Sequence, residues 1–111
     1  MTIYQSCLSE AANYTDRDAY ISDLALSSIW EDDEAADIPD GRLVWLGQLW
    51  DASHRSVKEI AAAAGLSQRK LAERFAIPYR TMENWCGGQR GCPEYVRLMM
   101  QECLGLLRHD V

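Results

Sequence analysis

A proline between two short apolar faces is the feature that most constrains the fold of this chain. Pro78 lies in the stretch from Leu66 to Cys92, which reads LSQRKLAERFAIPYRTMENWCGGQRGC. A proline lacks an N–H and has a fixed φ, so it can begin a helix but cannot continue one. Apolar residues recur at helical spacing on both sides of it, namely Leu71, Ala72 and Phe75 before it and Met82 and Trp85 after it. The pattern predicts two short helices, one ending near Phe75 and the next beginning at about Pro78.

The rest of the chain also has helical apolar spacing, and no strand pattern is evident. Apolar residues three and four positions apart predict helices over four further ranges: 2–13, 16–30, 41–64 and 93–107. We expect 41–64 to be one long helix that ends at Gly65. A kink near Ser53 and His54 is the alternative.

These elements predict an all-α protein, and 111 residues is the size of one domain. We expect residues 41–111 to form a small helical bundle that contains the helix-turn-helix. Residues 1–40 would add an acidic N-terminal helical pair, which packs on the bundle, makes a dimer or binds a partner.

Charge is distributed unevenly along the chain, whose net charge is −6. Residues 1–40 carry ten acids against one base, a net charge of −9, and residues 41–111 carry ten bases against seven acids, a net charge of +3. Such an asymmetry indicates two roles in one chain. The run from Glu31 to Glu34 predicts a loop that continues to Pro39. This loop is either a solvated linker or an acidic patch that meets a basic partner or mimics DNA phosphates.

The cysteines and histidines do not form a recognisable metal or catalytic pattern. Free thiols are predicted at Cys7, Cys86, Cys92 and Cys103. The spacing of Cys86 and Cys92 is not the usual one for zinc, and a redox-sensitive pair there is left open. His54 and His109 have no paired nucleophile, and neither a P-loop nor a dinucleotide fingerprint is present. We therefore expect no metal, no cofactor and no enzyme activity.

The N-terminus gives no sign of export. It has no basic segment followed by an apolar one, and the chain has no run of about 18 apolar residues. A cytoplasmic location without a membrane span is expected.

The stretch around Pro78 resembles the phage-repressor-like (Cro/XRE-type) helix-turn-helix family. The matching residues are Leu66, Ser67, Gln68, Leu71, Ala72, Phe75, Ile77, Met82, Trp85, Gly88 and Pro93. Three positions depart from the family pattern. Ala76 stands where the turn usually has Gly, Cys86 where Glu is common, and Pro78 where Ser or Thr often caps the second helix.

The resemblance implies a bacterial or phage transcription regulator, repressor-like, that binds operator DNA as a homodimer and places helix 78–86 in the major groove. By position, the residues that would contact bases are Tyr79, Arg80, Glu83 and Asn84. Those that would contact phosphates are Gln68, Arg69, Thr81, Gln89 and Arg90. Two alternatives are an antitoxin that represses its own operon, with residues 1–40 binding a toxin, and an acidic inhibitor that binds a protein partner.

Overall fold

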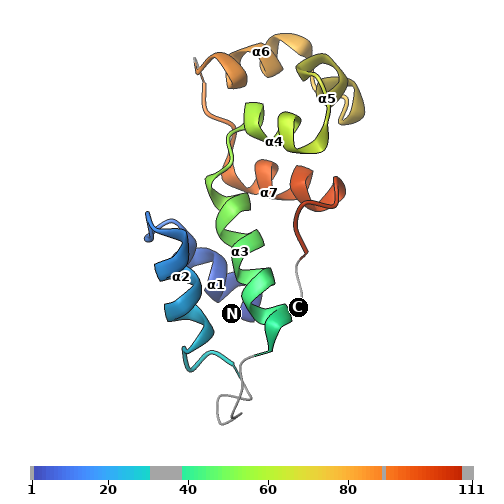
Figure 1. The fold of residues 1–111 in the computed structure, drawn as a ribbon. Coiled ribbons are helices and arrows are strands. Elements are labelled where there is room, and N and C mark those ends of the chain that lie inside the picture. The colour runs from blue at the N-terminus through green and yellow to red at the C-terminus, as the bar shows by residue number, and fades with distance from the viewer. Residues whose placement is uncertain (1, 31–38, 89, 109–111) are drawn as a thin grey trace. The chain divides into compact units, whose positions relative to one another are not determined.

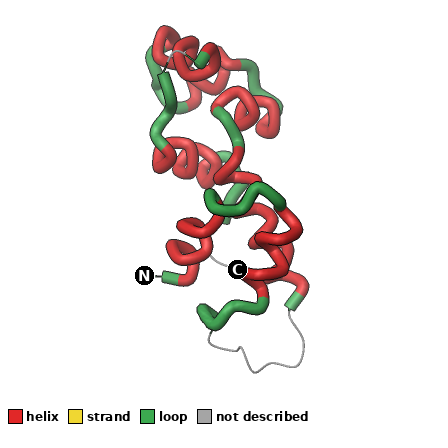
Figure 2. The backbone as a smooth tube through the Cα atoms, turned by 90° about the vertical axis from the view of Figure 1, so that its left-hand side faces the viewer, coloured by secondary structure: helices red, strands yellow, loops and turns green. Residues whose placement is uncertain are grey.

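Seven α-helices make up most of the residues that the structure describes, and these residues contain no strand (Figures 1 and 2). The structure is a computed structural model, which describes residues 2–30, 39–88 and 90–108. The helices are α1 (Ile3–Ala11), α2 (Arg17–Ala25), α3 (Asp40–His54), α4 (Val57–Ala64), α5 (Gln68–Arg74), α6 (Tyr79–Gly87) and α7 (Glu94–Cys103). The predicted all-α class is confirmed. The acidic run from Glu31 to Glu34 and the predicted phosphate contact Gln89 lie outside the described residues.

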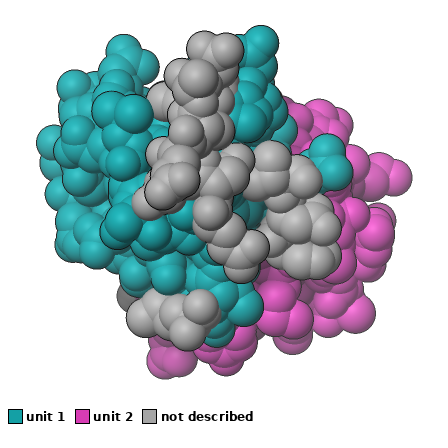
Figure 3. Space-filling model, turned by 90° about the horizontal axis from the view of Figure 1, so that it is seen from below, with its two compact units in different colours: residues 1–54, 107–111 teal, residues 55–106 magenta. Residues whose placement is uncertain are grey.

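The chain forms two compact units, which Figure 3 shows in different colours. Unit 1 comprises residues 1–54 and 107–111, and unit 2 comprises residues 55–106. Helix α3 packs against α1 and α2 and belongs to unit 1. Unit 1 carries twelve acids against three bases, a net charge of −9, and unit 2 carries eight bases against five acids, a net charge of +3.

The prediction of one long helix over 41–64 is wrong. Helix α3 ends at His54, and α4 begins at Val57 after an N-cap at Ser56. The Ser56 hydroxyl accepts a hydrogen bond from the Glu59 N–H at 3.2 Å, and the Glu59 carboxylate accepts one from the Ser56 N–H at 3.1 Å. This capping box starts a new helix, although the apolar spacing continues through the break. The alternative, a kink near Ser53 and His54, is therefore closer to the structure.

Two further helices are shorter than their apolar stripes predicted. Helix α2 ends at Ala25 rather than Trp30, and the Trp30 indole folds back and donates a hydrogen bond to the Leu24 carbonyl at 2.8 Å. Helix α7 ends at Cys103 rather than residue 107, shortly before Gly105, which has a φ of 76°. In both places a buried apolar residue lies in an irregular segment after the helix. Apolar spacing alone does not distinguish such a residue from one in the helix.

The core of unit 1 contains aromatic residues whose polar atoms are satisfied. The buried Tyr20 hydroxyl donates to the Cys7 carbonyl at 2.7 Å, which joins α2 to α1. The Trp45 ring of α3 meets Trp30 edge-on, with 6.0 Å between the ring centroids, and the buried Arg42 guanidinium lies 4.0 Å from the centre of the Trp30 ring. These contacts hold α3 in unit 1.

In unit 2, helices α4, α5 and α7 end in the same way. Each is followed by one residue with a left-handed backbone: Gly65 (φ 71°), Ala76 (φ 54°) and Gly105 (φ 76°). The next residue, which is Leu66, Ile77 or Leu106, donates its N–H back to the helix over 2.8–2.9 Å. The same three apolar residues pack against the core of unit 2. This arrangement is a Schellman motif, and only α5 makes it without glycine.

The alanine at the end of α5 is under backbone strain that glycine would relieve. We expect Ala76→Gly to raise the free energy of unfolding by about 1 kcal/mol, because a Cβ disfavours the left-handed region and the side chain is exposed. The matched control is Ala62→Gly in α4, which should lower it by about 0.5–1 kcal/mol. Urea unfolding measures both. A destabilised Ala76→Gly variant would contradict the strain at this turn.

Candidate nucleic-acid interface

Helices α5 and α6 form the predicted pair on either side of the turn at Ala76 and Ile77. Pro78 precedes α6 with φ −54° and ψ 133°, so the chain changes direction where the sequence indicated. The residues expected to form the core do so. Leu71, Ala72 and Met82 are buried, and Phe75 and Trp85 are half-buried against them. In unit 2 the α5–α6 pair packs on α4, which also contacts α7 (Figure 1).

One side of α6 is fixed in the core, and the opposite side is exposed. Met82 is fully buried, whereas Arg80 and Glu83 are exposed and Asn84 is half-buried. Residues three and four positions apart share one side of a helix, so the last three residues lie on a single outer face. The structure therefore brings together three of the four predicted base contacts.

The fourth predicted base contact, Tyr79, lies on a flank of α6 and not on that outer face. Its half-buried ring packs against the core of unit 2. The Arg69 guanidinium of α5 lies over this ring, with its Cζ 4.3 Å from the ring centroid. Two residues with separate predicted roles are thus in direct contact.

The predicted phosphate contacts do not form one cluster. Gln68 is the first residue of α5. It follows the N-cap Ser67, whose hydroxyl accepts a hydrogen bond from the Lys70 N–H at 3.1 Å. Thr81 is half-buried and lies about 200° around α6 from Tyr79, on the other flank. Arg90 is exposed beyond the C-terminus of α6.

Exposed cations are numerous in unit 2. They are Lys58, Arg69, Lys70, Arg74, Arg80 and Arg90, and none forms a salt bridge with a residue that the structure describes. Arg55 and Arg97 have a structural role instead, because Arg97 donates to the Arg55 carbonyl at 2.7 Å. Such a surface attracts a polyanion.

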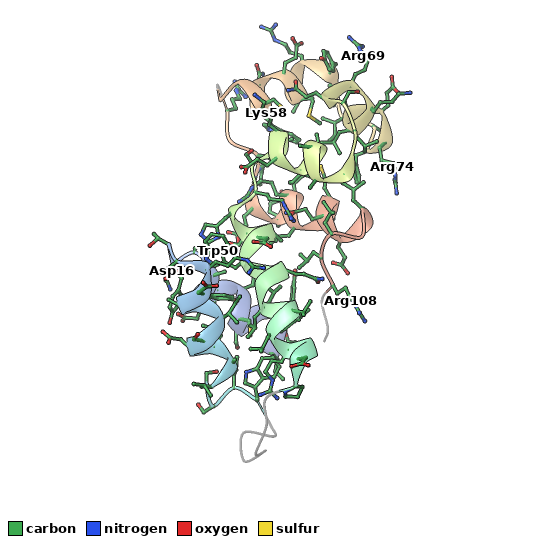
Figure 4. The ribbon with its side chains drawn as sticks, viewed as in Figure 1. Asp16, Trp50, Lys58, Arg69, Arg74 and Arg108 are labelled. Atoms are coloured by element: carbon green, nitrogen blue, oxygen red, sulfur yellow. The ribbon has the colours of Figure 1, made fainter. Side chains whose placement is uncertain are left out.

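Lys58 is a candidate phosphate contact that sequence reasoning missed. Figure 4 shows it on α4, on the side toward α6. Our prediction placed Lys58 in the middle of a long helix, where it had no relation to the helix-turn-helix. The capping box at Ser56 and Glu59 was the signal that would have placed it in the first turn of a separate helix.

The thiols differ in burial. Cys7 is fully buried, and burial raises its pKa to about 11. Burial also raises the pKa of Cys86 and of Cys92. Cys103 is exposed. Over the described ranges, no three Cys, His, Asp or Glu side chains lie together as a metal site requires, and no helix is long and apolar enough to cross a membrane.

No protein-family model matches the chain, and no curated protein or solved structure matches it either. The case for a function therefore depends on the helices and side chains described above.

Thiol reactivity should follow this order of burial. At pH 8 we expect Cys103 to react first with a disulfide reagent such as Ellman's reagent, because its thiol is exposed, whereas burial shields the other three thiols and raises their pKa values. Cys103→Ser should remove the fast phase, and Cys7 should react only after unfolding. A fast phase of two thiols in Cys103→Ser would instead indicate an activated Cys86 and Cys92 pair.

Proposed function

We propose that this protein is a sequence-specific, double-stranded-DNA-binding regulator of transcription that inserts α6 into the major groove. The observation that carries this proposal is the outer face of α6. It carries the exposed Arg80 and Glu83 and the half-buried Asn84, while Met82 on the opposite side anchors the helix in the core. The turn between α5 and α6 fixes the direction of α6 relative to α5.

The chemistry of the outer face suits base edges. The guanidinium of Arg80 can donate two parallel hydrogen bonds to guanine O6 and N7, and the amide of Asn84 can pair with adenine N6 and N7. Glu83 can accept from cytosine N4. An α-helix with its side chains is about 10–12 Å across, which suits a major groove about 12 Å wide.

Electrostatics favour a contact through unit 2. Its net charge of +3 attracts phosphates, whereas the net charge of −9 on unit 1 repels them. Non-specific attraction to DNA is therefore weak, and specific contacts must supply most of the affinity. One short helix reads only a few base pairs, so we propose that the protein binds as a homodimer to two half-sites of an operator.

The outer face is tested by selecting a preferred duplex from a random pool and measuring its affinity for variants. We expect Arg80→Ala and Asn84→Ala each to weaken binding by about 1–3 kcal/mol and to relax the preference at one base pair. Arg74→Ala, which removes an exposed arginine of α5, is the control and should keep the preference. Selection of no sequence by the wild type, or unchanged selectivity in both α6 variants, would rule out α6 as a recognition helix.

A second candidate is that unit 1 binds a protein partner, as in an antitoxin that regulates its own operon. Two observations favour it: the excess of acids in unit 1, and the exposed apolar side chains of Leu26 and Val44. We expect Val44→Asp to abolish co-purification of such a partner while DNA binding persists. A partner that persists in this variant, or a native protein that carries none, would contradict that role for unit 1.

A further inference from the structure

The flank of α6 that carries Tyr79 has a second distinctive position at Cys86. The two residues are seven apart, so they lie on the same side of the helix, two turns or about 10.5 Å along its axis. Each has a cation from a neighbouring helix beside it. Arg69 of α5 stacks on Tyr79, and the charge of Lys58 of α4 acts on the Cys86 thiol.

The contact between Arg69 and Tyr79 fixes a guanidinium at the beginning of α6. The ring is held by the core of unit 2, and the guanidinium Cζ lies 4.3 Å from its centroid. A cation over an aromatic face is attracted to the ring, which limits the orientations of a long side chain. Arg69 is otherwise exposed, so its N–H groups are accessible to an anion.

Lys58 is close enough to α6 to act on a residue of that helix. Burial raises the pKa of the Cys86 thiol, and the positive charge of Lys58 acts in the opposite direction. The lysine is exposed and has no salt bridge with any described residue. Its ammonium group is therefore an exposed cation whose charge reaches Cys86 in α6.

We propose that Lys58 and Arg69 bind backbone phosphates of one DNA strand along this flank of α6, and that Tyr79 is the platform that positions Arg69 and does not read a base. The inference rests on the proposed function and names the contacts that orient α6 in the groove. The opposite flank carries the neutral Thr81, so phosphate binding is asymmetric about the helix.

The two cations are tested by the salt dependence of binding. The affinity of the full-length protein for a fluorescent duplex of about 20 base pairs is measured over a series of salt concentrations. Lys58→Gln and Arg69→Gln should each reduce the slope of log K against log salt by about 0.9, on preferred and scrambled duplexes alike. The control, Arg74→Gln, removes a cation that also lies over an aromatic ring, that of Phe75, but projects from another side of α5 (Figure 4). It should leave the slope unchanged.

The platform role is tested by conservative variants. Tyr79→Phe keeps the ring and should bind with wild-type affinity and sequence preference. Tyr79→Leu removes the ring and should weaken binding several-fold on every duplex. Arg69→Lys keeps the charge but loses the planar stack, so it should weaken binding with an unchanged salt slope, and it still tests the role if Tyr79→Leu fails to fold.

Four results would overturn the inference. A changed base preference in Tyr79→Phe would show that Tyr79 reads a base. A reduced salt slope in Arg74→Gln would show that phosphate binding is not confined to Lys58 and Arg69. Wild-type slopes in Lys58→Gln and Arg69→Gln, with a wild type that binds DNA, would disprove the phosphate contacts and leave the proposed function intact. A wild type that binds no duplex at low salt would overturn both.

Discussion

The left-handed backbone at Ala76 is the constraint on which the geometry of the candidate interface depends. It reverses the chain after α5, lets the Ile77 N–H donate to the Ala72 carbonyl at 2.9 Å, and places Pro78 where α6 can begin. Because Met82 is then fixed in the core, the outer face of α6 carries its polar residues by helical geometry alone. A different turn would rotate or tilt this face.

The two units differ in charge, and the difference matters for the proposed function. Unit 2 has most of the exposed cations, while unit 1 has most of the carboxylates. A protein of this kind gains little from long-range attraction, so close contacts must determine where it binds. Guanidinium groups such as that of Arg69, held on a fixed ring, lose less conformational freedom on binding a phosphate than an unrestrained side chain would.

The α5–α6 pair could be predicted from sequence because its signals are local. Pro78 and the apolar residues around it determine where α5 ends and α6 begins, and the structure agrees. The break at Ser56 was missed because apolar spacing continues through it, so only the pair of Ser56 and Glu59 marks a new helix. The position of Tyr79 could not be predicted, because its partner Arg69 is ten residues away and meets it only after the turn has formed.

The central claim is that α6 is the element that contacts DNA, and an NMR titration tests it most directly. The backbone amides of the isotope-labelled protein would be followed as the selected duplex is added. The account predicts the largest shift changes in α6 around Arg80, Glu83 and Asn84, with smaller changes at Lys58 and Arg69 and none in α1 and α2. Changes confined to unit 1, or no change in α6 at saturating duplex, would contradict it.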